Sequence, residues 1–125
     1  MNATQQAETA YSTNARTVKT HRDTEYDAFA RITGRLKQAA KAGKGGFNDL
    51  ASALHDNRRL WTILATDVAD NDNGLPRDLR ARIIYLAEFT RIHSGKVLAG
   101  TAPADPLIEI NTAIMRGLHQ RSTEI

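Results

Sequence analysis

The most informative absence in this 125-residue sequence is that of cysteine. Without a thiol, the chain cannot form a disulfide bond, a thiolate zinc site or a cysteine nucleophile. Long apolar stretches are also missing: the longest uninterrupted run, residues 83–87, is far shorter than the ~20 residues of a bilayer-spanning helix. The first 20 residues lack the apolar core of a secretory signal. These absences predict a soluble, intracellular protein.

The composition is otherwise that of an ordinary globular chain, with 41% hydrophobic residues. The length suits a single domain over residues 1–125 and leaves no room for two independent cores. Lys and Arg number 17 and Asp and Glu number 14, for a formal net charge of +3. So small an excess does not by itself indicate nucleic-acid binding.

Three polar or glycine-rich breaks divide the chain, at residues 41–46, 70–74 and 100–103. Between them, apolar residues recur every three or four positions, which is the spacing of an amphipathic helix. The pattern predicts four main helices, which begin at Thr20, at Asn48 or Asp49, at Pro76 and at the Asp105-Pro106 pair. Four such helices with short connections predict an all-α fold, a small antiparallel helical bundle.

The N-terminal stretch through Val18 has a weaker pattern. Ala3, Ala7 and Tyr11 keep helical spacing with Val18, but most side chains here are small or polar. A helix of this kind buries too little apolar surface to be stable alone. The sequence leaves two alternatives: residues 1–18 form a mobile N-terminal arm, or they form a helix that orders against something else.

The apolar stripes of the four main helices predict the core. Asn57 lies in the middle of one stripe and Asn111 lies near another. A buried amide needs hydrogen-bond partners, so we expect each asparagine to bond to a break in the backbone or to the other asparagine, and to set the helix register. The predicted core comprises Phe29, Leu36, Leu54, Asn57, Trp61, Leu64, Ile83, Leu86, Ile110, Asn111 and Ile114.

No pattern of catalytic or metal-ligating residues emerges. The run at residues 70–74 resembles the start of a calcium-binding loop but departs from the EF-hand pattern, and a solvated turn explains it better. The four histidines do not pair at metal-site spacing, and we expect His93 to be a hydrogen-bonded core residue. The sequence therefore predicts a protein that is not an enzyme and has no cofactor or bound metal.

Some apolar residues fall outside the core stripes. Ile63 lies well off its stripe, beside Asp56 in helical projection, and Tyr85, Phe89 and Ile92 form a second apolar strip beside the main stripe of their helix. The strip has two interpretations. Either this helix is central in the bundle and is covered on both sides, or it offers an apolar groove to a helix of another protein.

The charges are also unevenly spread, with a basic, an acidic and a basic segment in succession. Neighbouring helices that pair with each other explain this order most simply. The alternative is a basic surface that meets RNA or an acidic protein, although aromatic stacking platforms for single-stranded RNA are missing. The residues of that surface would be Arg31, Arg35, Arg77, Arg80 and Arg91.

Four segments of the chain resemble the flagellar biosynthesis regulator FlaF family. They occur in the family's order and together cover most of the chain from Thr20 to Leu118. One departure is that the family often has a serine-proline pair where this chain has Thr20-His21. The segments are residues 24–29, 57–67, 73–84 and 110–118, in which the central one reads Asn-Arg-Arg-Leu-Trp-Thr-Ile-Leu-Ala-Thr-Asp.

The resemblance implies a small cytoplasmic protein that is needed for flagellar filament formation. It implies action on flagellin, as a secretion chaperone and as a regulator of flagellin synthesis, alongside the companion regulator FlbT. We expect a helix of flagellin to lie in an apolar groove, and the runner-up is direct binding of flagellin mRNA. The candidate contact residues are Ile63, Tyr85, Phe89 and Ile92, with Arg58 and Arg59 at the rim.

Overall fold

A computed structural model describes residue 3 and residues 25–124 of the chain, with side chains through residue 117. Within these residues the first helix spans residues 25–41, and a 3-10 turn follows at η1 (Gly43–Gly46). Three further helices are α2 (Phe47–Ala69), α3 (Arg77–Leu98) and α4 (Asp105–Glu124). No strand occurs in this part of the chain, which confirms the predicted all-α class. The predicted start at Thr20 and the N-terminal arm or helix lie outside the described residues.

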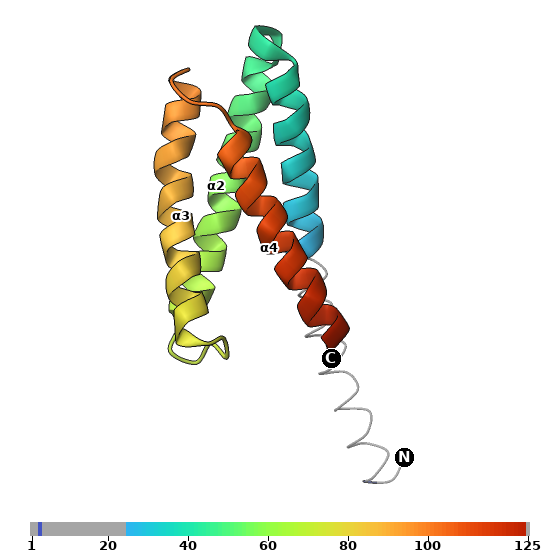
Figure 1. Cartoon of the computed structure of the whole chain (residues 1–125), viewed down its shortest axis with the longest axis vertical. Helices are drawn as coiled ribbons and strands as arrows, with labels where there is room; N and C mark the ends of the chain where they lie inside the picture. The colour runs from blue at the N-terminus through green and yellow to red at the C-terminus, as the bar shows by residue number, and fades with distance from the viewer. Residues whose placement is uncertain (1–2, 4–24, 125) are drawn as a thin grey trace.

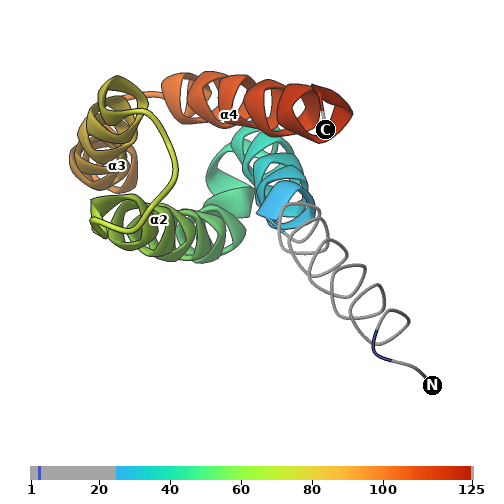
Figure 2. The same cartoon turned by 90° about the horizontal axis from the view of Figure 1, so that it is seen from below.

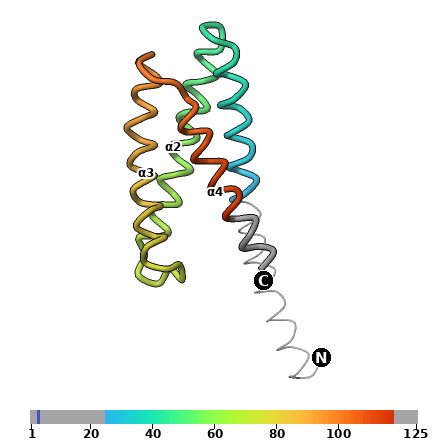
Figure 3. Tube along the Cα trace, in the orientation of Figure 1, coloured from blue at the N-terminus to red at the C-terminus, as the bar shows by residue number. Residues whose placement is uncertain are grey.

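The four helices alternate in direction along the chain, as Figure 1 shows. Seen from below, α2 lies between α3 and the 25–41 helix, and α4 covers the opposite side (Figure 2). The helix α4 does not run parallel to its neighbours. It starts beside the end of α3 and diverges from α3 towards its own C-terminus (Figure 3).

The helix boundaries follow from local backbone chemistry. Gly43 adopts a positive φ of 62° directly after the 25–41 helix, a conformation that glycine tolerates best. At Gly46, a Cβ atom would lie 2.7 Å from the carbonyl oxygen of Ala39, so only glycine allows this close turn into α2. The helix α2 consequently begins at Phe47, one residue before the earlier of the two predicted starts.

The last two helices start close to the predicted positions. Pro76 directly precedes α3, and its carbonyl accepts a hydrogen bond from the Arg80 N–H. For α4, the carbonyl of Ala104 accepts hydrogen bonds from the N–H groups of Leu107 and Ile108, so Ala104 occupies the N-cap that we predicted for Asp105. Between them, Gly100 with a φ of 76° closes the end of α3.

The core consists of two apolar clusters stacked along the bundle. The first lies near the α3–α4 connection and includes Leu36, Leu54 and Leu107. The second is built around Phe29 and Trp61, whose rings meet edge to face with centroids 5.7 Å apart. Of the remaining predicted core residues, Ile83 is buried in the second cluster, and the half-buried members that pack against it are Leu64, Leu86, Ile110 and Ile114.

A buried polar network lies between the two clusters. The Asn111 amide donates hydrogen bonds to Asn57 Oδ1 at 2.8 Å and to Thr33 Oγ1 at 3.1 Å. Its Oδ1 accepts a third from the indole N–H of Trp61 at 2.9 Å. The two asparagines therefore bond to each other, and the network joins α4 to α2 and to the 25–41 helix.

We expect Trp61→Ala to lower the free energy of unfolding by about 3–5 kcal/mol, because it leaves a cavity in the second cluster and removes the indole donor of Asn111. Urea denaturation of the two proteins measures the difference. An unchanged midpoint would contradict the position of Trp61 in the core.

Candidate partner-binding surfaces

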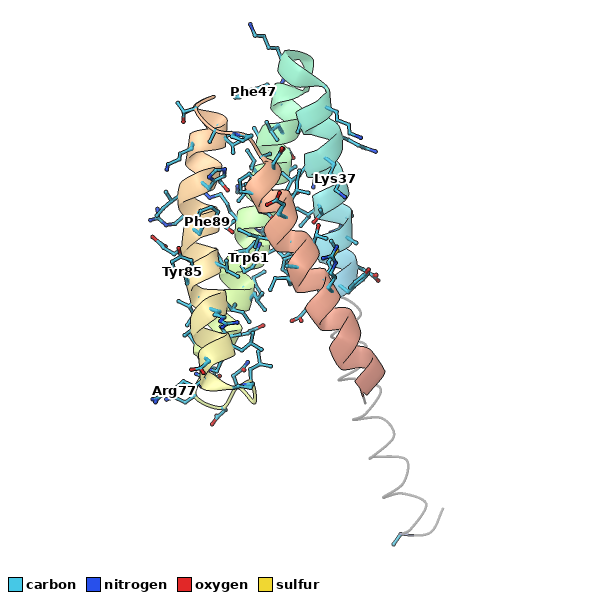
Figure 4. All side chains as sticks on the ribbon, in the orientation of Figure 1. Lys37, Phe47, Trp61, Arg77, Tyr85 and Phe89 are labelled. Atoms are coloured by element: carbon cyan, nitrogen blue, oxygen red, sulfur yellow. The ribbon has the colours of Figure 1, made fainter. Side chains whose placement is uncertain are left out.

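The outer flank of α3 carries an exposed apolar strip, which we call the α3 stripe. It consists of Tyr85, Phe89 and Ile92, spaced four and three residues apart on one side of the helix. The side chain of Tyr85 is 69% exposed and that of Ile92 is 48% exposed. Figure 4 shows Tyr85 and Phe89 on α3, with Trp61 further inside the bundle. The stripe therefore presents apolar surface to solvent.

Phe89 connects the stripe to the bundle. Its ring packs against the first core cluster and stacks on the imidazole of His93, with ring centroids 5.3 Å apart. His93 Nε2 lies 2.8 Å from the carbonyl oxygen of Pro103, just before α4. His93 is half-buried and hydrogen-bonded, so it holds the end of α3 to the connection with α4.

The position of α3 decides between the two interpretations of its second apolar strip. The helix lies at an edge of the bundle, next to α2 and α4 (Figure 2). Its buried residues, such as Ile83 and Val97, follow a different line from Tyr85 and Ile92. The helix is therefore not central, and the strip is left uncovered by the described residues.

The structure separates the other candidate contacts from the α3 stripe. Ile63 is 57% exposed on α2, and its spacing of seven residues from Asp56 places both on one flank of that helix. Asp56 pairs with Arg35 of the 25–41 helix, so Ile63 lies on the flank that faces this helix. Arg58 and Arg59 are also exposed on α2. Arg59 precedes Ile63 by four residues and shares its flank, whereas Arg58 lies about 140° round the helix from Ile63, so the three do not form one rim around the α3 stripe.

The ion pair between Arg35 and Asp56 joins the predicted basic and acidic segments. Arg35 donates to Asp56 Oδ2 at 2.6 Å and to Ser52 Oγ at 3.0 Å. This hydrogen bond holds the pKa of Asp56 below its ordinary value. The resulting stabilisation is present at neutral pH and is lost as the pH falls through the lowered pKa. Because both side chains are more than a third exposed, it amounts to less than about 1 kcal/mol.

Two further arginines of the proposed basic surface make internal contacts. Arg80 donates from Nε to the Val68 carbonyl at 2.6 Å and from a terminal nitrogen to the Asp70 carbonyl at 3.0 Å. It thereby satisfies carbonyl groups at the end of α2. Arg91 pairs with Glu88 on its own helix at 2.6 Å. With Arg35 already paired, only Arg31 and Arg77 of the five remain exposed without an interaction of this kind among the described residues.

The polar turn between α2 and α3 is closed by its own side chains. Asp70 Oδ1 accepts the N–H of Asp72, and Asn73 Oδ1 accepts the N–H of Leu75. The amide of Asn73 donates to the carbonyl of Asp67. In the described part of the chain, no group of three or more His, Asp or Glu residues is arranged to hold a metal ion.

The sequence did not indicate a groove that opens where α4 diverges from α3. It has a volume of about 670 Å³ and lies between the second half of α4 and the lower ends of α2 and α3. We call it the acidic groove, because apolar side chains form its floor and four acidic residues line it. The apolar residues include Leu64, Val68, Leu79, Ile83 and Ile114, and the acidic ones are Glu25, Asp67, Asp70 and Asp72.

Comparison with known proteins identifies one family. The family model described as flagellar protein FlaF matches residues 7–118. No curated protein and no solved structure matches the chain. Among the described residues, none of the helices has the length and apolarity needed to cross a membrane.

The contacts of Arg80 lead to a prediction about stability. Arg80→Gln removes charge-assisted hydrogen bonds to the end of α2, so we expect a loss of about 1.5–3 kcal/mol in the free energy of unfolding. Arg77→Gln removes the same charge from an exposed position in the same helix and should change it by no more than about 0.5 kcal/mol. Urea midpoints measure both, and equal effects would contradict the structural role of Arg80.

Proposed function

The chain belongs to the FlaF family of flagellar proteins, and from this we propose that it binds flagellin, acting as a flagellin secretion chaperone and controlling flagellin synthesis and filament assembly. The observation that supports this proposal best is the α3 stripe. Tyr85 and Ile92 are large, exposed and aligned along one side of a helix, and they border the half-buried ring of Phe89. Such a stripe suits the apolar face of a partner helix.

The physical basis of the contact is the burial of apolar surface. A helix of flagellin that packs along α3 would remove Tyr85, Phe89 and Ile92 from water. Complete burial of a large apolar side chain is worth about 1.5–3 kcal/mol, and these residues are partly covered already. The contact therefore supplies enough free energy for reversible binding, as a chaperone that must release its client requires.

The proposal also explains how a small helical bundle would act on flagellin. The terminal helices of flagellin assemble with those of neighbouring subunits in the filament. A bundle that covers one of these helices would prevent premature polymerisation while the subunit waits for export. The amount of free protein would then report the amount of unexported flagellin, which links binding to the control of synthesis.

The companion regulator FlbT is a further proposed partner. Ile63 and Arg59 lie on one exposed flank of α2, apart from the α3 stripe. This separation leaves α2 accessible to a second partner while flagellin covers α3. A three-component binding measurement with flagellin and FlbT tests whether both bind together.

We expect Tyr85→Ala and Ile92→Ala each to weaken the binding of purified monomeric flagellin about three- to tenfold, because each removes apolar area from the contact. Isothermal titration calorimetry measures the dissociation constants. Ile84→Ala is the matched control, since Ile84 is 44% exposed on the same helix but lies outside the stripe. All three positions are exposed, so circular dichroism should show an unchanged fold.

Normal flagellin binding by the folded Tyr85→Ala and Ile92→Ala variants would contradict the α3 contact. Loss of affinity in Ile63→Ala alone would move the flagellin contact to α2. Phe89 is less suitable for this test, because its ring also packs against the first core cluster.

The alternative proposal, binding of flagellin mRNA, predicts a different response to salt. RNA binding neutralises phosphates and weakens steeply with ionic strength, whereas apolar helix packing does not. We expect gel shifts with flagellin leader RNA at about 50 and 200 mM salt to show only weak binding that is indifferent to RNA sequence. Tight, salt-sensitive and sequence-selective binding that is lost in Arg31→Gln and Arg77→Gln would favour the RNA alternative.

A further inference from the structure

The acidic groove is an apolar depression of about 670 Å³, and it is separate from the α3 stripe. It exists because α4 leaves the side of α3 and packs towards the 25–41 helix, so the lower part of the α2–α3 pair is uncovered (Figures 1 and 3). Its floor includes Leu64, Leu79 and Ile114, which are only half-buried. An apolar occupant would complete the burial of these residues.

The charge of the groove restricts what its occupant can be. Among the described residues that line it are Glu25, Asp67, Asp70 and Asp72, and none of those described is a lysine or an arginine. The helix α2 also ends here, but the guanidinium of Arg80 offsets the partial negative charge of its C-terminus, so the charge of the groove comes from its carboxylates. The guanidinium of Arg80 lies nearby but is directed to the carbonyls of Val68 and Asp70. The groove therefore favours a segment that combines apolar and basic side chains.

The sequence contains such a segment next to the groove. Residues 1–24 directly precede Glu25, and Glu25 itself lines the groove, so this segment is tethered at its edge. Tethering gives a segment a high effective concentration at a neighbouring site. The part closest to Glu25 is basic, and the segment also carries apolar residues at helical spacing. The basic residues are Arg16, Lys19 and Arg22, against one acidic residue, Asp23, in the same part, and the largest apolar ones are Met1, Tyr11 and Val18.

The family comparison gives independent support for a role of this segment within the domain. The match to the FlaF family model begins at residue 7, well before the first described helix. Most of residues 1–24 therefore belong to the family pattern and are not an appendage of this chain.

We propose that the chain's own N-terminal segment, residues 1–24, binds in the acidic groove. The apolar and basic residues of this segment match the apolar floor of the groove and the acidic residues Asp67 and Asp72 at its rim. The segment thus completes the bundle on the side where α4 diverges. This proposal does not rest on flagellin binding, because the groove and the α3 stripe are different surfaces.

Paramagnetic relaxation measurements on the full chain test this contact without a partner. The chain has no cysteine, so Thr17→Cys provides a single site for a nitroxide label within the basic part of the segment. We expect the methyl signals of Leu79 and Ile114 to lose most of their intensity in dilute solution. The methyl signals of Leu54 and Leu107, in the first core cluster near the other end of the bundle, should keep theirs.

Two matched variants test the electrostatic part of the proposal. Asp67→Asn combined with Asp72→Asn removes two charges from the rim and should restore much of the lost methyl intensity. Asp49→Asn combined with Asp78→Asn removes the same charge from exposed positions that do not line the groove and should restore none. Equal recovery in the two double variants, or no recovery in either, would overturn the role of the rim.

A mixing experiment identifies the occupant. Isotope-labelled chain without nitroxide is mixed with nitroxide-labelled chain that carries no isotope. Intensity losses at Leu79 and Ile114 in this mixed sample would mean that a second copy fills the groove, which would overturn the proposal. Unchanged intensities at both methyl groups in the singly labelled chain would also overturn it. Losses in the singly labelled chain that are relieved by Asp67→Asn combined with Asp72→Asn, and not by the control pair, would support it, because the short tether alone also brings the label near the groove.

Discussion

The side-chain amide of Asn111 is the interaction on which the arrangement of the bundle depends. It donates to Asn57 and Thr33 and accepts from Trp61, so one residue of α4 is bound to two other helices inside the core. A shift of α4 along the bundle would leave these buried groups without partners, at a cost of about 1–3 kcal/mol for each group. The network therefore fixes the register of α4 and, with it, the course that opens the acidic groove.

The fixed bundle presents surfaces of different chemistry on different helices. The α3 stripe is apolar and exposed, whereas the acidic groove combines an apolar floor with negative charge. Two of the arginines stabilise the bundle itself, because Arg35 holds the 25–41 helix to α2 and Arg80 closes the end of α2. With Arg91 paired to Glu88, three of the five arginines of the proposed basic surface are engaged within the fold, which weakens the case for a nucleic-acid surface.

The sequence predicted the features that depend on local periodicity and on the needs of buried polar groups. The helical spacing indicated the all-α class, and the two asparagines on apolar stripes indicated that each would bond to a break in the backbone or to the other asparagine, of which the structure shows the second. Periodicity does not show which neighbouring helix, if any, covers a second apolar strip. The exposure of Tyr85 and its separation from Ile63 could therefore be seen only in the three-dimensional structure. The sequence could not predict the acidic groove either, because the groove results from the angle of α4 and not from any one segment.

The proposed function depends on which surface flagellin covers, and hydrogen–deuterium exchange of the full chain with and without monomeric flagellin measures this directly. We predict that flagellin slows amide exchange along the middle of α3, around Tyr85, Phe89 and Ile92, and leaves exchange unchanged in the part of α2 around Ile63. Slower exchange confined to α4 and the lower end of α2, where the acidic groove lies, would contradict it. So would an exchange pattern that flagellin leaves unchanged.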